Sequence, residues 1–146
     1  MSEIPAYLRN GYITPEELFS IIPKPSEERL RKRPVAIPEC PQEIPCAPCR
    51  EICPTGAISM PTPNDLPTVD YEKCIGCSLC VQICPGLAFF MVHYVEDKAR
   101  ITMPHELLPV PKKGKRSFSS TALEGRLEGE RFSPSYRGRR AKETRQ

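Results

Sequence analysis

The apolar residues of this chain occur in short runs separated by prolines, a pattern that predicts small helices and strands rather than long ones. The run TPEELFSII, residues 14–22, has the pattern of a helix. Thr14 suits the N-cap, Pro15 suits the first turn, and Glu17 completes a capping box. Pro23 predicts the end of this helix. PVAIPE, residues 34–39, predicts a short extended segment broken by its prolines.

Two further apolar runs, AISM at 57–60 and LAFFMV at 87–92, predict strands. FFMVHYV and ARITM flank a polar turn at residues 96–98, and together they predict a β-hairpin. From residue 115 onward large apolar residues are few. We therefore expect residues 115–146 to lack regular structure or to become ordered only on a partner.

An internal repeat with an offset of 31 residues connects two parts of the chain. The repeat maps one cysteine motif onto another: Cys46, Cys49, Cys53 and Pro54 onto Cys77, Cys80, Cys84 and Pro85. Apolar positions also match, as Ile44 with Ile75, Ile52 with Ile83, Ala57 with Ala88, and Met60 with Met91. We therefore expect the repeat to be structural as well as chemical. Each half should hold a cysteine loop, a short helical turn ending near Cys-Pro, and a strand.

Composition narrows the class of protein. The chain has 146 residues, eight cysteines, eighteen prolines and no tryptophan, and 39% of its residues are hydrophobic. Such a chain predicts one modest domain with extensions, whose small core needs cross-links or metals for stability. It has no apolar run long enough to span a membrane and no secretory signal pattern, so we expect a cytoplasmic protein. In that setting the cysteines indicate metal or redox chemistry rather than disulfides.

The charge is divided unevenly. Residues 1–114 carry 12 Lys+Arg and 14 Asp+Glu, whereas residues 115–146 carry nine Lys+Arg and four Asp+Glu. The basic tail could contact nucleic acid, but its arginines are scattered among glutamates. We therefore expect a solvated or partner-docking tail and no binding of nucleic acid.

The second cysteine motif is CIGCSLCVQICP, from Cys74 to Pro85. Its spacing is that of bacterial ferredoxins, in which three cysteines bind one [4Fe–4S] cluster and the fourth binds the other cluster. Gly76 permits backbone conformations closed to other residues, and Pro85 directs the chain out of the loop. Zinc is the alternative, but structural zinc sites usually use paired cysteine knuckles rather than a triplet.

The first motif departs from this spacing at one position. Cys40 lies six residues before Cys46, and Glu43 occupies the place where a regular motif has its first cysteine. We expect the arm between Cys40 and Cys46 to fold back so that Cys40 is the fourth ligand. A three-iron cluster with Cys40 free, or an oxygen ligand from Glu43, remains an alternative. The predicted sets are Cys40, Cys46, Cys49 and Cys84 for cluster 1, and Cys74, Cys77, Cys80 and Cys53 for cluster 2.

Other candidate residues receive no ligand or catalytic role. His93 and His105 are the only histidines, and the cysteines already supply two clusters. Tyr71 is expected to pack over a cluster, and Phe89 and Phe90 to shield the clusters from water. The sequence has no phosphate-binding loop, flavin motif or nucleophile-and-base pair. It therefore predicts no catalytic residue and no enzyme activity of its own.

These motifs resemble the two-cluster bacterial ferredoxins. More narrowly, RPVAIPECPQEIPCAPCREICPTGAI is similar to the small iron–sulfur subunit of flavin-dependent dehydrogenase complexes that oxidise proline, hydroxyproline or related secondary amines. The segments GYITPEEL and PHELLPVPKKG also fit that family, so the resemblance covers roughly residues 8–114. It implies that the eight cysteines are ligands and that the chain relays electrons from a flavoprotein subunit to an external acceptor.

The sequence thus predicts an α+β, ferredoxin-like dicluster fold with a pseudo-two-fold repeat, a C-terminal hairpin and a basic tail. The expected parts are an N-terminal extension with a short helix (1–36), a dicluster domain with the hairpin (37–104), and a proline-punctuated loop with a flexible tail (105–146). Two alternatives to an electron-transfer subunit remain. One is a free-standing dicluster ferredoxin, and the other is a structural zinc protein that binds nucleic acid.

Overall fold

The computed structural model describes residues 6–96, 98–106, 116–121 and 125–131. Its helices are α1 (Ala6–Asn10), α2 (Pro15–Ile21), α3 (Glu27–Lys32), α4 (Pro48–Ile52) and α5 (Leu79–Ile83). Its strands are β1 (Val35–Pro38), β2 (Ile58–Ser59), β3 (Thr68–Val69), β4 (Phe89–Val95), β5 (Lys98–Thr102), β6 (Arg116–Thr121) and β7 (Gly125–Arg131). The protein is thus a small mixture of helix and sheet, as expected. No helix in these ranges is long and apolar enough to cross a membrane.

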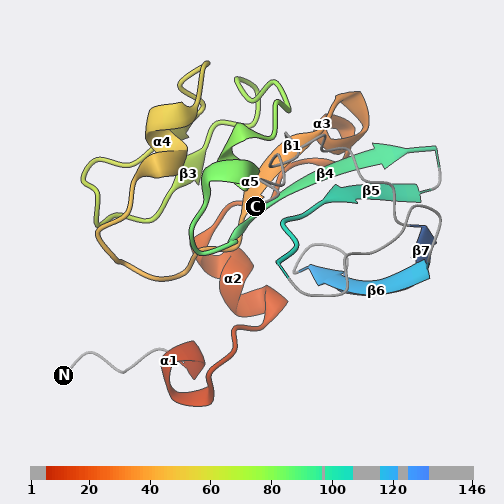
Figure 1. Ribbon diagram of the computed structural model, residues 1–146, viewed down its shortest axis with the longest axis horizontal. Helices are drawn as coiled ribbons and strands as arrows, with labels where there is room; N and C mark the ends of the chain where they lie inside the picture. The colour runs from red at the N-terminus through yellow and green to blue at the C-terminus, as the bar shows by residue number, and fades with distance from the viewer. Residues whose placement is uncertain (1–5, 97, 107–115, 122–124, 132–146) are drawn as a thin grey trace, which may run out of the picture.

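The central sheet has three antiparallel strands in the order β1-β4-β5, with β4 in the middle (Figure 1). The β4–β5 pair confirms the predicted hairpin, with Val95 opposite Lys98. Glu96, which lies in the turn after β4, has a backbone φ of 56°. The strands β2 and β3 form a separate antiparallel pair beside α4 (Figure 1).

The segment predicted to be merely extended, residues 34–39, contributes a fully buried strand. β1 pairs with β4 from Val35 opposite Val92 to Pro38 opposite Phe89. Because β1 is an edge strand of this sheet, the missing N–H of Pro38 is tolerated. The prolines that suggested a broken segment are therefore compatible with strand structure at this edge.

The capping box predicted at Thr14 is present. The Thr14 hydroxyl accepts from Glu17 N at 3.2 Å, and Thr14 N donates to the Glu17 carboxylate at 2.9 Å. The helix begins at Pro15 and ends at Ile21, before Pro23.

Neither α1 nor α3 was predicted from the sequence. α3 begins after Ser26, whose hydroxyl accepts from Arg29 N at 3.2 Å.

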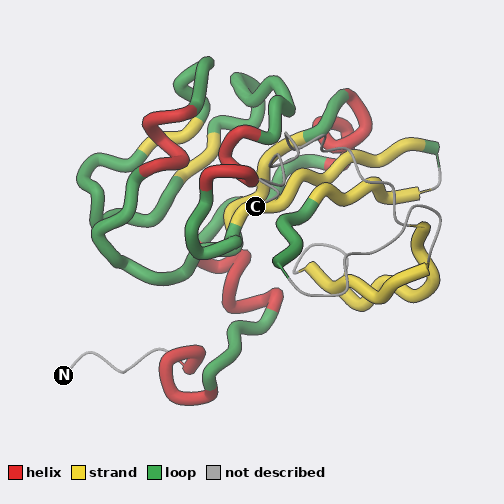
Figure 2. The backbone as a smooth tube through the Cα atoms, viewed as in Figure 1, coloured by secondary structure: helices red, strands yellow, loops and turns green. Residues whose placement is uncertain are grey.

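The helices α4 and α5 are related by the 31-residue offset, and each ends immediately before a Cys-Pro pair. Loops make up most of the chain between residues 39 and 88, as Figure 2 shows. The repeated apolar positions do not all serve packing. Met60 and Met91 are buried, whereas Ile44 and Ile75 are 49% and 48% exposed. Ile52 and Ile83 are also exposed, so only part of the matched apolar positions is buried in the core.

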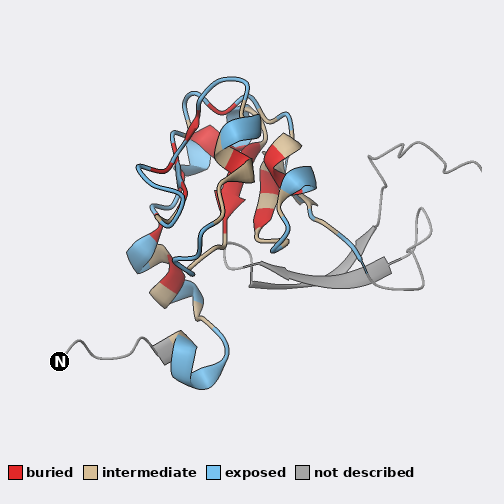
Figure 3. Ribbon diagram, turned by 60° about the vertical axis from the view of Figure 1, so that its left-hand side comes forward, coloured by how far each residue is buried: buried red, intermediate tan, exposed pale blue. Residues whose placement is uncertain are grey.

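The core lies where β1 and β4 meet α3 and the cysteine loops (Figure 3). Phe89, Leu30, Ile37, Val35 and Val92 are its largest fully buried side chains. Three cysteines, Cys49, Cys74 and Cys80, belong to the same buried cluster. The cysteine loops are therefore part of the core itself.

β6 and β7 form an antiparallel pair with an irregularity between Ser117 and Ser119. Residues 115–146 were expected to be largely disordered or to become ordered only on a partner, and β6 and β7 give part of this segment strand structure. The pairing is made by backbone groups, a feature that composition does not reveal. The remainder of the predicted tail lies outside the described residues.

Candidate metal centre

All eight cysteines are described, and none forms a disulfide. They lie in the loops and short helices between β1 and β4. Thiolates are the ligands that iron–sulfur clusters and zinc prefer, so this donor set is suited to soft metals. The arrangement of the cysteines in space then distinguishes between such centres.

The structure brings Cys53, Cys74, Cys77 and Cys80 together around one cavity. The cavity occupies about 330 Å³, part of it open to solvent. Its remaining lining includes Ala36 of β1 and Met91 of β4. These are the four cysteines predicted for cluster 2, with Cys53 supplied by the other half of the repeat.

The loop of Cys74 is shaped by local constraints. Cys74 N donates to Asp70 O at 3.1 Å, and the Asp70 carboxylate accepts from the backbone N–H groups of Glu72 and Lys73. Gly76 has a φ of +75°, and a Cβ at this position would lie 2.8 Å from Pro34 O. Only glycine therefore fits this turn without strain, as its position in the motif predicted.

The other four cysteines influence one another electrostatically. Burial, followed by the charges of Cys84 and Cys46, raises the pKa of Cys49 to about 11. Burial also raises the pKa of Cys40, and the charges of Cys84 and Cys46 contribute to this effect. Since such effects require proximity, Cys46 and Cys84 lie near both Cys40 and Cys49, and these four cysteines are the set predicted for cluster 1.

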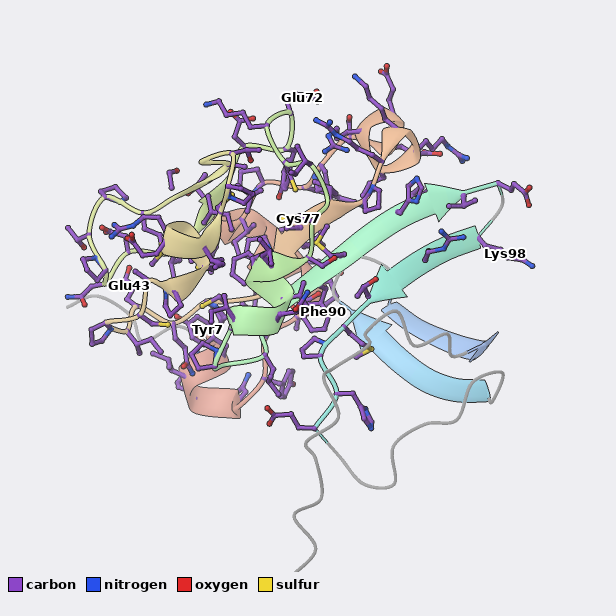
Figure 4. The ribbon with its side chains drawn as sticks, turned by 45° about the horizontal axis from the view of Figure 1, so that its top comes forward. Tyr7, Glu43, Glu72, Cys77, Phe90 and Lys98 are labelled. Carbon is purple, nitrogen blue, oxygen red and sulfur yellow. The ribbon has the colours of Figure 1, made fainter. Side chains whose placement is uncertain are left out.

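The arm between Cys40 and Cys46 folds back and is held at both ends. The Tyr7 hydroxyl of α1 donates to Pro41 O at 3.0 Å, and Cys46 N donates to Pro63 O at 2.9 Å. Glu43, the alternative oxygen ligand, is exposed on this arm, and Figure 4 places it well away from Cys77. The charges of Cys84 and Cys46 act on Cys40, so it lies near these two cysteines, whereas Glu43 is exposed.

Thiol acidity differs between the remaining cysteines. Burial, with the charges of Cys74 and Cys77, raises the pKa of Cys80 to about 12. For Cys53, burial alone would raise the pKa, but hydrogen bonds from Thr55 and from nearby backbone N–H groups lower it overall. A backbone N–H also reaches the Cys84 sulfur, where Ala88 N donates at 3.3 Å. Cys49 and Cys80 must therefore lose protons when a metal binds.

Neither group of cysteines converges on a single point. Among the described residues, no three His, Cys, Asp or Glu side chains are close enough together to hold one metal ion. A zinc ion needs its four ligands at about 2.0–2.3 Å from one centre. A four-iron cluster instead presents a separate iron to each thiolate. The four cysteines that line the cavity, Cys53, Cys74, Cys77 and Cys80, fit such a cluster better than they fit zinc.

Of the residues that received no ligand role, Tyr71 and Phe89 pack in the buried cluster that contains Cys74, whereas the two histidines are not part of it. His93 is half-buried on β4, and its buried Nδ1 has no hydrogen-bond partner, while His105 is exposed. Tyr71 is half-buried, its hydroxyl donates to Pro23 O, and burial followed by the charge of Cys74 raises its pKa to about 12. Phe89 is fully buried in the core.

One residue near the site was not singled out from the sequence. Arg29 of α3 is 3% exposed, and it donates to the backbone carbonyl of Cys74. The sequence contains no local signal for this burial, because two of the three carbonyls that accept from Arg29, those of Tyr71 and Cys74, lie far along the chain.

Residues 67–90 match the protein family described as the 4Fe–4S binding domain. An uncharacterised ferredoxin of Methanocaldococcus jannaschii is 38% identical over 80 residues, which are 53% of this chain and 49% of that protein. The sulfite dehydrogenase of Allochromatium vinosum has a subunit that is 48% identical over 44 residues, 30% of this chain and 17% of its own. The thiosulfate reductase electron transfer subunit of Salmonella typhi is 42% identical over 55 residues, 38% of this chain and 26% of its own.

The chain therefore spans about half the length of the first of these relatives and about a quarter or less of the other two. No solved structure matches the chain. The family match covers the second cysteine motif, from Cys74 to Cys84, together with β3 and the start of β4. This part of the chain is a ferredoxin-type 4Fe–4S binding domain.

Proposed function

We propose that this chain, whose residues 67–90 are a ferredoxin-type 4Fe–4S domain, carries electrons by means of two [4Fe–4S] clusters. The observation that carries the proposal is that Cys53, from the first cysteine motif, lines one cavity with Cys74, Cys77 and Cys80 of the second. The effects of Cys84 and Cys46 on both Cys40 and Cys49 support the second proposed set. Each set takes three cysteines from one half of the repeat and one from the other. Such an exchange of the fourth ligand is the pattern of two-cluster ferredoxins.

The proposed ligands follow these sets. Cluster 1 is bound by Cys40, Cys46, Cys49 and Cys84, and cluster 2 by Cys74, Cys77, Cys80 and Cys53. When bound, each cluster supplies reversible one-electron exchange and makes or breaks no bond in a substrate. The chain itself contributes no catalytic residue.

Residues around the cysteines limit the access of water to a bound cluster and stabilise negative charge on its sulfur ligands. The buried positions of Cys49, Cys74 and Cys80 limit the access of water, which influences the redox potential of a bound cluster. The Ala88 N–H donates to the Cys84 sulfur and stabilises negative charge there. The Tyr71 hydroxyl donates to Pro23 O, and this hydrogen bond connects the start of the Cys74 loop to the N-terminal extension.

We further propose that the chain is a subunit that relays electrons from a flavin-dependent amino-acid dehydrogenase to an external acceptor. Two of its relatives are named as subunits, of a sulfite dehydrogenase and a thiosulfate reductase, which supports a role inside an oxidoreductase complex. The flavoprotein partner rests on the resemblance of residues 8–114 to the amine dehydrogenase subunits. A free-standing ferredoxin is the second candidate, favoured by the similarity over 80 residues to a protein named a ferredoxin.

Metal analysis of the anaerobically purified chain tests the proposed clusters. We expect about eight iron and eight sulfide per chain and a broad absorbance near 400 nm, as two [4Fe–4S] clusters require. Cys40→Ser should lower the iron content and alter one of two cluster signals. Glu43→Gln, a matched change on the same arm, should alter neither signal. A colourless protein containing zinc and no iron would overturn the proposal.

The proposed partner is tested by anaerobic purification from the native source, followed by analysis of bound flavin. A complex in which substrate-derived electrons reduce first a flavin and then this chain would support the subunit role. Purification as a single iron–sulfur chain that exchanges electrons with several unrelated enzymes would favour the free carrier instead.

A further inference from the structure

Arg29 is a buried cation beside the second cysteine loop. Among the described residues, it is the one polar or charged residue that is buried, with 3% of its surface exposed. It lies on α3, before the cysteine region, yet its side chain reaches the loop that leads to Cys74. The N-terminal extension therefore contributes a positive charge to the surroundings of one cysteine group.

The guanidinium is held by three backbone carbonyls. Its Nε donates to Tyr71 O at 2.6 Å and its Nη2 to Cys74 O at 2.7 Å. Its Nη1 donates to Arg33 O at 2.9 Å. These bonds fix the position of the charge, because the planar guanidinium has little freedom once all three are formed.

Among the described residues, the ion-pair partner of Arg29 is the Glu72 carboxylate, which is too distant for a hydrogen bond and is exposed to water. The nearest paired carboxylate, that of Glu72, lies 3.9 Å from the Arg29 Nε, and its side chain is 73% exposed. A buried cation without a close counter-ion is unfavourable. A metal centre that carries thiolate charge on Cys74 and its neighbours would supply the missing negative charge.

We propose that Arg29 is a positioning residue that raises the reduction potential of the cluster bound by Cys74, Cys77, Cys80 and Cys53. This inference rests on the proposed function. Reduction adds one electron and hence one negative charge to the centre, and a fixed buried cation stabilises the reduced form more than the oxidised form. The same side chain holds the backbone of Cys74 in place through its carbonyl.

Two other arginines provide the comparison within the chain. Arg31, on the same helix as Arg29, is exposed and paired with the Glu27 carboxylate at 2.7 Å, so water and Glu27 screen its charge. Arg50, next to Cys49 of the other cysteine group, is paired with the Glu51 carboxylate at 2.6 Å. Neither places an unneutralised buried charge near a cysteine, so neither should have the effect of Arg29.

A redox titration of the full holoprotein tests the inference. Dithionite supplies the electrons, and electron paramagnetic resonance follows the two reduced signals separately. We expect Arg29→Gln to move one of the two midpoints to a more negative potential and to leave the other nearly unchanged. The expected change is about tenfold or more in the ratio of reduced to oxidised cluster, or about 59 mV for a one-electron couple.

Arg29→Lys keeps the charge while losing part of the hydrogen bonding, so its midpoint should stay closer to that of the wild type. Arg31→Gln, the matched loss of an exposed and paired charge on the same helix, should shift neither midpoint. A merely structural role for Arg29 would lower the thermal midpoint of Arg29→Gln without changing the potential.

The possible results are distinguishable. The inference is overturned if the glutamine variant titrates like the wild type, if both midpoints move equally, or if the lysine variant shifts as far as glutamine. A wild-type chain without bound iron and sulfide would overturn the proposed function, and this inference with it. A chain with intact clusters and unchanged variant potentials would overturn this inference alone.

Discussion

Replacing Gly76 by alanine tests how closely the second cysteine loop packs against the chain that leads into β1. Gly76 lies between Cys74 and Cys77 with a φ of +75°. An added Cβ would lie 2.8 Å from Pro34 O and 3.1 Å from Pro34 Cβ. The substitution therefore combines an unfavourable backbone conformation with a steric clash.

The two costs are separable. The left-handed conformation costs an L-residue about 1–2 kcal/mol, of which about 0.4–1 kcal/mol is offset by the stiffer unfolded chain. The clash involves a backbone oxygen, which cannot rotate away, and forcing extra atoms into a packed site typically costs about 1–3 kcal/mol. Gly56→Ala is the matched control, because Gly56 has a φ of +60° and nothing within 4 Å of the added Cβ.

We therefore expect Gly76→Ala to be less stable than Gly56→Ala by about 1–3 kcal/mol. For a chain of this size, that difference lowers the thermal midpoint by roughly 4 °C per kcal/mol. The assay is thermal unfolding of the holoprotein at one fixed heating rate, with absorbance near 400 nm reporting cluster loss. Equal midpoints for the two variants, or a lower midpoint for Gly56→Ala, would refute the assigned contact with Pro34.

Three further substitutions probe the N-terminal extension. Thr14→Ala removes the capping box of α2 and should cost about 0.5–2 kcal/mol in thermal unfolding, whereas Ser20→Ala on the exposed face should cost little. Leu18→Ala empties a fully buried position, so a loss of about 2–5 kcal/mol is expected, and a change below 1 kcal/mol would contradict its burial. Tyr7→Phe removes the hydrogen bond to Pro41 O and should cost about 0.5–1.5 kcal/mol. It should also speed iron release from one cluster only, measured with a chelator, and equal release from both clusters would count against that contact.

The features that the sequence predicted correctly depend on neighbours along the chain. The cap at Thr14 needs only the next three residues, and the hairpin turn at Glu96 needs only polar residues between two apolar runs. α3 could have been found in the same way, since Ser26 precedes two glutamates and the helix ends in basic residues. The local information was present in all three cases.

Features that depend on distant contacts were beyond such reasoning. β1 becomes a buried strand because Val35 pairs with Val92, far along the chain. Arg29 is buried because carbonyls of Tyr71 and Cys74 accept its hydrogen bonds. The spacing of the cysteines predicted that Cys53 joins Cys74, Cys77 and Cys80, and these four cysteines line one cavity. That the eight cysteines bind two clusters is what we propose from this arrangement.

The pairing of β1 with β4 has a consequence for how the chain folds while it is being synthesised. Residues 39–88, with all eight cysteines, lie between the paired Pro38 and Phe89. At a synthesis rate of about 5–20 residues per second, the apolar strand β1 stays unpaired for roughly 3–10 s before β4 has been translated. Closing so long a loop costs roughly 3–4 kcal/mol of chain entropy. A metal centre assembled within the loop would shorten it, so the supply of iron and sulfide during translation should determine how long β1 remains exposed to aggregation.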